Sequence, residues 1–435
     1  MRPDIPKGVL IAAPQSGSGK TTLTLSLLRA LKNRGTAVVS AKSGPDYIDP
    51  KYHEAASGAP CINLDAWAMA PDALRGLAAQ QTQEAEFCIV EGAMGLFDGA
   101  ANGKGSAADL AVTLKIPVVL VVDCAKQAQS VAALVAGFQG FRGDVHIAGV
   151  ILNKVGSARH ETMLRAALTP VGVPVLGALP RSGDLVLPER HLGLVQAGEH
   201  EELEAFLERA GCLCAERVDL SALADMARPL VSASGMKAAL LPPLGQRIAV
   251  ARDVAFAFSY PHVLEGWRQQ GAELSFFSPL ADEAPDPLCD AVFLPGGYPE
   301  LHTGPLARAD TFKAGLKNAA AAGILIYGEC GGYMVLGEGL TDAAGERHEM
   351  LGLLPLETSF QTRKRHLGYR VLEPLAGAPW DGALSGHEFH YACIVREGSA
   401  DRLFAADDAD GNTLSDMGLR AGSVMGSFAH VICAR

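Results

Sequence analysis

Short apolar runs alternate with longer amphipathic stretches from residue 8 to about residue 180. Each run has the length of one strand, and the stretches between the runs have the character of helices. The runs lie at residues 9–13, 37–41, 87–91, 118–123 and 147–152. Because strands that alternate with helices form parallel sheets covered on both faces, this region is predicted to be an α/β domain.

The same alternation restarts in the second half of the chain. Residues 181–244 lose it, apart from a polar helix predicted near residues 199–210, and end in a proline pair. Apolar runs begin again at residue 248 and continue at 274–277, 291–294 and 324–327, with shorter strands predicted at 350–360, 368–372, 390–395 and 426–432. We therefore predict two α/β domains, residues 1–195 and 246–435, joined by a linker segment, residues 196–245.

Bulk composition limits the classes of protein and partner. The 435 residues are too many for one ordinary core, and 49% hydrophobic with 20% charged residues is typical of a globular protein. The net charge of −11 disfavours nucleic acid and anionic membranes as partners. The longest apolar run, residues 116–122, is too short to span a bilayer, and no secretion signal is visible. Since the nine cysteines include no C-x-x-C pair, we expect reduced thiols and a cytoplasmic location.

A glycine-rich loop, APQSGSGKTT at residues 13–22, follows the first predicted strand and begins the first predicted helix. Such a loop surrounds a phosphate with backbone N–H groups, and the helix N-terminus adds a positive dipole. Lys20 is predicted to neutralise the terminal phosphates and Thr21 to offer a hydroxyl to Mg²⁺. Pro14 stands where the strict motif has glycine, so the match is to a variant loop, and a plain turn before a helix is the alternative. The predicted ATP-binding set is Gly17, Ser18, Gly19, Lys20, Thr21 and Thr22.

Acidic residues follow two other predicted strands, at the edge where open parallel sheets bind ligands. Asp46 and Glu91, with Thr21, are predicted Mg²⁺ ligands because hard cations prefer oxygen ligands. Asn153, at the end of another strand, is predicted to contact adenine through its amide. Exposed loop acids and a turn-forming asparagine are the alternatives.

A cysteine occupies a sharp turn between an apolar strand and a helix, in the segment YGECGGY at residues 327–333. Small neighbours permit strained backbone angles there, and the helix dipole favours a thiolate at Cys330. His430 is predicted to take the thiol proton, and the N–H of Gly297, in a glycine turn after another strand, to bind the oxyanion. An inert buried thiol is the alternative. Three other histidines are also candidate bases: His366, His387 and His390.

Taken together, these segments resemble the cobyrinic acid and hydrogenobyrinic acid a,c-diamide synthases of cobalamin biosynthesis over nearly the whole chain. The resemblance implies an N-terminal P-loop domain similar to dethiobiotin synthetase, acting as an ATP-binding amide ligase. It also implies a C-terminal class I glutamine amidotransferase domain of the cobyric-acid type. The segments that carry it are APQSGSGKTT (13–22), GPDYIDP (44–50), EGAMGLFDG (91–99), GVILNKVGS (149–157), PERHLGLVQAGEH (188–200), LPGGYPE (294–300), ECGGYM (329–334) and GHEFHYA (386–392).

The resemblance assigns Cys330 and His430 as the catalytic pair of the glutaminase. A recognisable third acid is missing, because Val431 and Ile432 follow the histidine where better-known triad enzymes have Pro-Glu. The implied reaction uses ATP and Mg²⁺ to make an acyl phosphate. Ammonia from glutamine then amidates the c and a acetate carboxylates of hydrogenobyrinate, a corrinoid small molecule. Because neutral ammonia is a minor species at neutral pH, a sheltered path between the sites is expected.

Tyr47, Asp49 and Asp98 share loops with the predicted metal ligands and are expected near the corrinoid, with structural loop acids as the alternative. A basic cluster at residues 363–366 is a candidate substrate contact, although solvated surface is the more usual role of a charge run. The alternative functions are the same reaction on cobalt-containing cobyrinate, cobyric acid synthase, and a partition-type regulatory ATPase. The last class needs no nucleophile, which speaks against it. The sequence leaves the oligomeric state open, with a homodimer among the options.

Overall fold

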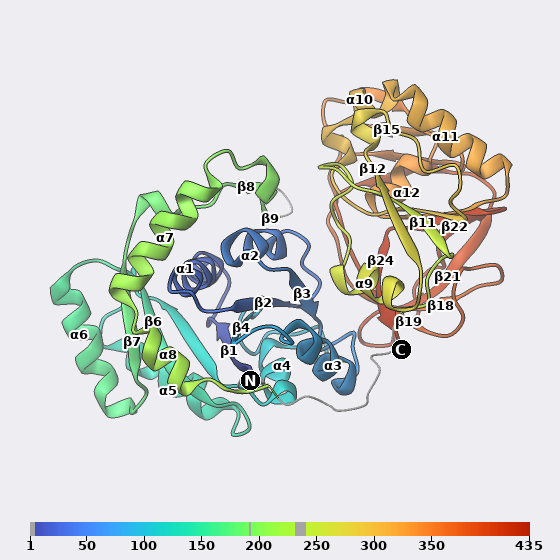
Figure 1. Cartoon of the computed structure of the whole chain (residues 1–435). Helices are drawn as coiled ribbons and strands as arrows, with labels where there is room; N and C mark the ends of the chain where they lie inside the picture. Colours follow the sequence, from blue (N-terminus) through green and yellow to red (C-terminus); the bar gives the residue numbers. More distant parts are fainter. Residues whose placement is uncertain (1–4, 191–192, 231–240) are drawn as a thin grey trace. The chain divides into compact units, whose positions relative to one another are not determined.

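The computed structural model describes residues 5–190, 193–230 and 241–435. The chain divides into two compact units, unit 1 (residues 1–238) and unit 2 (residues 239–435), which are described separately (Figure 1). Two segments of the chain lie partly outside the described residues. They are the family segment at 188–200, which lacks residues 191–192, and the expected linker, which lacks residues 231–240.

Unit 1 is built on one sheet in the order β3-β2-β4-β1-β5-β6-β7, and β10 pairs with the start of β1. Neighbours along this order run parallel, whereas β10 is antiparallel to β1. β1 is central, so the loop after it lies at the carboxyl edge where parallel sheets bind ligands. The strands are β1 (Lys7–Ala12), β2 (Val38–Ser43), β3 (Cys61–Leu64), β4 (Phe87–Glu91), β5 (Val118–Asp123), β6 (Ile147–Val155), β7 (Val175–Pro180) and β10 (Arg228–Pro229), with a separate pair β8 (Glu189–Arg190) and β9 (Gly193–Leu194).

Helices cover both faces of this sheet. α1, α2 and α7 pack together on one face, and α3 and α4 pack together on the other (Figure 1). The helices are α1 (Lys20–Asn33), α2 (Asp49–Ser57), α3 (Pro71–Gln81), α4 (Ala107–Leu114), α5 (Ser130–Phe141), α6 (Ala158–Leu168), α7 (Leu203–Arg217) and α8 (Leu220–Met226), with short 3₁₀ turns η1 (Thr169–Val171), η2 (Gly183–Leu185) and η3 (Ala197–Glu199). The predicted doubly covered parallel sheet is confirmed.

The expected linker differs in the structure, because its described first part belongs to unit 1. α7 packs along α1, and β10 joins the sheet beside β1. Arg29, on α1, is only 2% exposed, and its Nη1 donates to Oε1 of Glu204 and of Glu208 at 2.5 Å each. The charged residues of α7 suggested a solvated connection, but its buried positions recur at helical spacing and form an apolar stripe. These positions are Phe206, Leu207, Ala210, Gly211 and Cys214.

Unit 2 contains a larger mixed sheet in the order β12-β11-β13-β14-β23-β22-β21-β18-β19-β24. The strands from β12 to β23 run parallel, and the pairs from β23 to β24 are antiparallel. β14 is therefore flanked by parallel strands on both sides, and its carboxyl end is a second ligand edge. The strands are β11 (Arg247–Ala251), β12 (Glu273–Phe277), β13 (Ala291–Leu294), β14 (Leu325–Glu329), β18 (His366–Pro374), β19 (Leu384–His390), β21 (Asp401–Asp407), β22 (Met417–Ala421), β23 (Val424–Ser427) and β24 (Ala429–Ala434).

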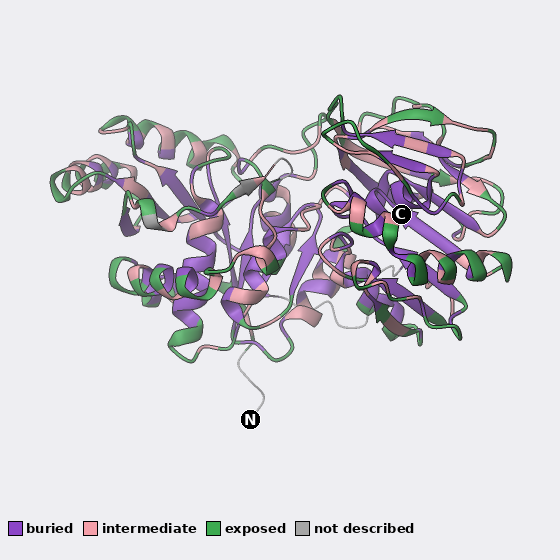
Figure 2. Cartoon of the chain, turned by 90° about the horizontal axis from the view of Figure 1, so that it is seen from above, coloured by how far each residue is buried: buried purple, intermediate pink, exposed green. Residues whose placement is uncertain are grey.

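A small second sheet, four α-helices and two 3₁₀ turns complete the described part of unit 2. The sheet has the order β16-β15-β17-β20. Its strands are β15 (Gly339–Thr341), β16 (Arg347–Glu349), β17 (Leu356–Ser359) and β20 (Cys393–Glu397). The helices are α9 (Pro261–Gln269), α10 (Thr303–Arg308), α11 (Asp310–Ala321) and α12 (Gly331–Leu336), with 3₁₀ turns η4 (Pro279–Ala281) and η5 (Pro299–Leu301). Figure 2 shows that buried residues run along most strands of the two main sheets, whereas exposed residues gather on the surrounding helices and loops.

The strand pattern of unit 2 is only partly the expected one. The strand predicted at 426–432 is two strands that meet at Phe428, because β23 pairs with β14 whereas β24 pairs with β19. The strand predicted at 390–395 likewise spans the end of β19 and the start of β20, which belong to different sheets. Continuous apolar character cannot distinguish one strand from two when the chain moves between sheets.

Candidate active sites

The phosphate loop joins β1 to α1 at the carboxyl edge of the unit 1 sheet. Gly17 and Gly19 take left-handed φ angles of 79° and 83°, which residues with side chains adopt only with strain. A Cβ on Gly19 would also lie 2.2 Å from Nδ2 of Asn153. The Ser18 hydroxyl donates to the Gln15 carbonyl at 2.9 Å, which closes the loop. Strand, glycine loop and helix therefore follow one another as the sequence predicted.

Lys20, Thr21 and Thr22 form the first turn of α1. The buried ammonium of Lys20 donates to the carbonyl oxygen of Met94 at 2.8 Å. Burial and the positive charge of Lys42 lower the pKa of Lys20. A bound anion would counteract both effects, so this ammonium is suited to binding a phosphate.

One hydroxyl and two carboxylates converge beside the phosphate loop. Oγ1 of Thr21 lies 2.8 Å from Oε1 of Glu91 and 3.3 Å from Oδ2 of Asp49. Nζ of Lys42 lies 2.5 Å from the same Asp49 oxygen and 2.7 Å from the same Glu91 oxygen. These oxygens already attract a cation, and hydroxyl and carboxylate oxygens are the donors that Mg²⁺ prefers. The residues present therefore fit a magnesium ion.

Asp46 has a different place from the one expected for a metal ligand. Its Oδ1 accepts hydrogen bonds from the backbone N–H of Ile48 at 2.9 Å and of Asp49 at 3.0 Å. Its Oδ2 lies 3.9 Å from Nζ of Lys42. Burial and the charge of Asp49 raise the pKa of Asp46 to about 6. Asp49, which was predicted to contact the substrate, thus lies beside the Thr21 hydroxyl. Asp46, which was predicted to bind the metal, is linked to this cluster by its contact with Lys42.

Two residues of this cluster were missed by the sequence argument. Lys42 is buried at the end of β2, and its carboxylate neighbours raise its pKa although burial acts to lower it. His53 is fully buried, with Nε2 2.7 Å from Oε2 of Glu91 and Nδ1 3.5 Å from Sγ of Cys61. Burial acts to lower the pKa of His53, but Cys61 and Glu91 raise it to about 10. A lysine directly after the apolar run at residues 37–41 was the available signal for Lys42.

The remaining candidates of unit 1 lie at the same edge of the sheet. Asn153, in β6, donates from Nδ2 to the carbonyl of Ser18 at 2.8 Å, so its amide holds the phosphate loop. Asp98 is exposed, and its Oδ2 accepts from the N–H of Gly95 at 3.0 Å. Tyr47 is half-buried in the loop before α2. Adenine contact by Asn153 and substrate contact by Tyr47 and Asp98 stay predictions.

The cysteine of unit 2 lies on a strained turn between β14 and α12. Cys330 has φ 46° and ψ −103°, a conformation that costs on the order of 1–3 kcal/mol and is typical of functional turns. Its N–H donates to the carbonyl of Ser427 at 2.8 Å, which ties the turn to the end of β23. A Cβ on Gly332 would lie 2.0 Å from the carbonyl oxygen of Leu294. The predicted elbow is therefore present, and its glycines provide space for close packing.

His430 lies against the same turn. A Cβ on Gly296 would lie 3.0 Å from Nε2 of His430 and 3.2 Å from Cβ of Cys330. Gly296 therefore adjoins both side chains, and any larger residue there would crowd them. Burial raises the pKa of the Cys330 thiol, and the nearby carboxylate of Glu300 raises it further. Because the resting thiol is protonated, attack on an amide requires a base, and His430 lies beside it.

Gly297 lies next to the residue that follows the cysteine. A Cβ on Gly331 would lie 3.0 Å from the backbone nitrogen of Gly297, so the Gly297 N–H is close to the elbow. The N–H of Gly331 acts in the opposite direction to burial and lowers the pKa of Cys330. The N–H groups of Gly297 and Gly331 thus belong to two segments that meet at the elbow, and an oxyanion requires donors of this kind.

The comparisons with known proteins match both units. Residues 9–195 match the CobQ/CobB/MinD/ParA nucleotide binding domain, and residues 247–435 match the CobB/CobQ-like glutamine amidotransferase domain. The hydrogenobyrinate a,c-diamide synthase of Brucella anthropi is 63% identical over 98% of this chain and 98% of its own. Those of a Sinorhizobium species and of Rhizobium meliloti are 60% and 58% identical, each over 98% of this chain and 98% and 99% of their own lengths. This chain belongs to the hydrogenobyrinate a,c-diamide synthase family.

Family membership confirms the resemblance inferred from the sequence segments and the two-part α/β fold. A family glutamine amidotransferase needs one base at its cysteine, and the other three histidines have different surroundings from His430. His387 is the cross-strand partner of His430, and burial with the nearby His430 lowers its pKa to about 3. His390 is hydrogen-bonded to Glu388 at 3.0 Å and is stacked on His366, with ring centroids 4.6 Å apart.

Outside the two sites, the basic cluster at residues 363–366 lies largely in solvent, as expected for an ordinary charged surface segment. Arg363, Lys364 and Arg365 are exposed, and His366 is half-buried. Along the described chain, no helix combines the length and apolar character that crossing a bilayer demands.

Proposed function

We propose that this chain catalyses the ATP- and glutamine-dependent amidation of the c and a acetate carboxylates of hydrogenobyrinate, through acyl phosphates. The observation that carries this proposal is the presence of two complete strand–turn–helix sites in one chain. One combines a phosphate loop with a carboxylate cluster, and the other combines a strained cysteine with a histidine. The 63% identity to a hydrogenobyrinate a,c-diamide synthase, over 98% of both chains, supports hydrogenobyrinate as the proposed substrate.

In unit 1 the proposed reaction is transfer of the γ-phosphoryl group of ATP to a substrate carboxylate. A carboxylate oxygen attacks the γ-phosphorus, the bond to the bridging oxygen breaks, and ADP leaves. Lys20 and the N–H groups of the phosphate loop hold the phosphates, while Thr21, Glu91 and Asp49 would hold Mg²⁺. Bound there, the ion neutralises phosphate charge. The ammonium of Lys42 lies between Asp49 and Glu91, so its positive charge can stabilise an anionic oxygen that binds in this cluster.

In unit 2 the proposed reaction is hydrolysis of glutamine. His430 accepts the proton of Cys330, and the thiolate attacks the amide carbonyl carbon while the N–H groups of Gly297 and Gly331 hold the oxyanion. The C–N bond breaks, His430 protonates the departing nitrogen, and ammonia leaves a thioester. Water then attacks the thioester, His430 takes its proton, and glutamate is released. Ammonia attacks the acyl phosphate carbon, the bond from that carbon to the phosphate oxygen breaks, and the proton lost by the nitrogen leaves with the phosphate, so that the amide remains.

The substrate and its surroundings extend the same proposal. Tyr47, Asp49 and Asp98 are proposed to face the corrinoid, and Asn153 the adenine. Asp46, predicted as a metal ligand, is proposed to support the metal site through Lys42. Cobalt-containing cobyrinate and the substrate of cobyric acid synthase are the alternatives within the same chemistry. The strained Cys330 disfavours a partition-type ATPase, which has no use for a nucleophile. We place the enzyme in the cytoplasm, with the domain boundaries of the sequence analysis shifted so that residues 203–230 join the ATP-binding unit.

The deciding experiment follows the mass of the corrinoid. Purified protein is incubated with ATP, Mg²⁺ and glutamine, with hydrogenobyrinate in one reaction and cobyrinate in another. We expect two successive carboxyl-to-amide conversions on hydrogenobyrinate, with one ADP formed per amide. Conversion of cobyrinate alone would identify the cobalt-containing substrate, and a different number of amides would indicate another synthase. An unchanged corrinoid with both nitrogen sources would overturn the proposal.

A further inference from the structure

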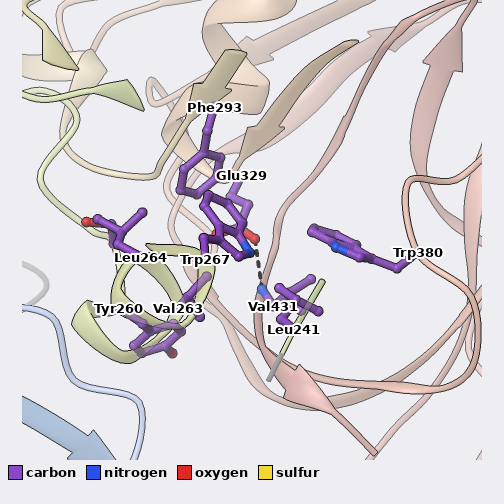
Figure 3. A pocket seen from close by; sticks show the side chains of 10 residues that line it. Leu241, Tyr260, Val263, Leu264, Trp267, Phe293, Glu329, Trp380 and Val431 are labelled. Carbon is purple, nitrogen blue, oxygen red and sulfur yellow. Dashed lines mark hydrogen bonds between the residues drawn. The ribbon is translucent and has the colours of Figure 1, made fainter. Parts of the chain in front are cut away.

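The residue immediately before the nucleophile is a buried carboxylate. Glu329 is the last residue of β14 and is 4% exposed. Its Oε1 accepts a hydrogen bond from the N–H of Val431 at 2.9 Å, so the side chain points from the elbow strand to β24 (Figure 3). Its Oε2 lies 3.6 Å from Nδ1 of His430, which is 1% exposed. Two successive residues, the last of β14 and the first of the turn, therefore provide an acid beside the histidine and the thiol.

The two ring nitrogens of His430 face different partners. Nε2 and Cε1 lie against Gly296, which also adjoins Cβ of Cys330, whereas Nδ1 faces Glu329. A histidine base works through one nitrogen, and an acid at the other nitrogen fixes the ring orientation and stabilises the imidazolium. At 3.6 Å the contact is an ion-pair distance and is longer than a hydrogen bond, as catalytic contacts often are before substrate binds.

We propose that Glu329 is the positioning residue for His430 and replaces the acid that triad amidotransferases place after their histidine. This inference rests on the proposed glutaminase activity of unit 2. Glu329 itself touches neither the glutamine nor the thiol sulfur in this role. Its hydrogen bond to Val431 fixes one oxygen and thereby directs the other towards the imidazole.

The surroundings of Glu329 favour a charge interaction. The carboxylate lines a small cavity whose other walls are largely apolar, and the aromatic residues around it come from α9, β13 and the segment after β18 (Figure 3). A charge pair is stronger in such surroundings than in water, so the acid matters most when His430 becomes positively charged. The apolar lining includes Leu264, Trp267, Phe293, Trp380 and Val431.

Glu388 is another buried acid near the site, and both its oxygens have other partners. Its Oε2 lies 2.6 Å from Nη2 of Arg370, and its Oε1 lies 3.0 Å from Nε2 of His390. These pairs lower the pKa of Glu388 to about 2, although burial acts to raise it. Glu388 is therefore held by its own strand pair β18–β19, and it serves as a buried comparison residue.

Glu329→Gln is the first test, because a glutamine keeps an acceptor for the N–H of Val431 and removes the negative charge from Nδ1 of His430. Steady-state glutaminase kinetics are measured on the full chain. We expect kcat to fall by about tenfold to 10⁴-fold, the range over which orientation of a catalytic histidine matters, with KM for glutamine within about twofold. Amidation supported by ammonium chloride should be unchanged, which also shows that the variant is folded.

Two further variants sharpen the result. Glu329→Asp keeps the charge on a shorter side chain, so its kcat should lie between those of the wild type and Glu329→Gln. Glu388→Gln, the matched buried control, should change kcat for glutamine by less than Glu329→Gln does. A Glu329→Gln kcat within twofold of the wild type would overturn the positioning role. So would equal kcat values for the Asp and Gln variants, or a larger loss in Glu388→Gln.

The outcomes separate this inference from the proposed function. Wild-type protein without glutaminase activity would contradict the function assigned to unit 2. Active wild type with an equally active Glu329→Gln would leave that function intact and contradict only the role of Glu329. If Glu329→Gln fails to fold, the Asp variant decides, because a kcat at wild-type level would then show that the exact placement of the acid has no effect.

Discussion

The phosphate loop of unit 1 and the cysteine elbow of unit 2 are both glycine-rich turns between a central parallel strand and a helix, but glycine has different roles in them. In the loop, Gly17 and Gly19 adopt positive φ angles themselves, and the backbone curves around an anion site. In the elbow, the positive φ belongs to Cys330, and neighbouring Gly332 provides space for close backbone packing. Glycine supplies conformational freedom in the first turn and volume in the second.

The two sites also differ in the charged groups that surround them. Unit 1 gathers lysines and carboxylates that pair with one another, as expected where a polyanion and a divalent ion bind. Unit 2 surrounds its thiol with buried groups, so the pKa of Cys330 is raised and a base is required. One site is suited to holding charge, and the other to producing a nucleophile for a short time.

The largest expected effect is that of Cys330→Ser on the use of glutamine. Loss of a nucleophile costs on the order of 10⁶ in kcat in other hydrolases, so glutamine-supported amidation should fall to background. Ammonia-supported amidation should persist, because unit 1 does not use the thiol. The measurement is product formation with each nitrogen source.

The matched control for this variant is Cys289→Ser, which changes another buried thiol of unit 2 outside the elbow. It should keep glutamine-supported amidation. Residual glutamine use by Cys330→Ser at wild-type rate would contradict the division of labour between the two turns.

The reverse pattern is expected for Lys20→Ala. Removing one preorganised donor that stabilises transition-state charge costs about 10²–10³ in kcat in other enzymes, so amidation should fall with glutamine and with ammonia alike. Glutaminase activity of unit 2 should remain. Lys51→Ala, which removes an exposed lysine paired with Glu54, is the control and should retain amidation. An effect of Lys20→Ala confined to glutamine would contradict the assignment of the loop.

Smaller effects are expected when each glycine turn receives a methyl group. Gly19→Ala combines a positive φ with a Cβ 2.2 Å from Asn153, and Gly297→Ala places its Cβ 2.0 Å from the carbonyl oxygen of Ala255. Each should lower the free energy of unfolding of its own unit by about 1–3 kcal/mol. Gly19→Ala should raise KM for ATP, and Gly297→Ala should lower kcat for glutamine. Calorimetry measures the stability of each variant, and separate assays of phosphoryl transfer and of glutamine hydrolysis measure its activity. An effect of Gly19→Ala on glutamine hydrolysis, or of Gly297→Ala on KM for ATP, would contradict this comparison.

The smallest expected effect is a pH dependence of stability from Glu388. Its folded pKa of about 2 lies below the ordinary glutamate value of 4.5, so its ion pairs stabilise unit 2 above about pH 4.5. This contribution is lost progressively as pH falls from 4.5 towards 2, because protonation in the unfolded chain comes first. The difference in Tm between wild type and Glu388→Gln should be a few degrees near neutral pH and should shrink on acidification. A difference that stays constant down to pH 2 would contradict the assigned pairing.

The sequence by itself determined the two α/β units, the two glycine turns and their order along the chain. These features are local, since strand length, glycine spacing and the residues Lys20, Thr21 and Cys330 lie in short continuous segments. The same local argument misassigned the described part of the linker, because the buried stripe of α7 is recognised only when α1 is beside it.

The tertiary structure decided which distant residues meet at each turn. Lys42 joins Asp49 and Glu91 because β2 and β4 are neighbours in the sheet, and no spacing along the chain specifies that pairing. His430 reaches the elbow because β23 pairs with β14 before the chain moves to β19, which also turns Glu329 towards its ring. Sheet order brings these residues together through long-range hydrogen bonds, and it therefore completes sites that the local sequence could only begin.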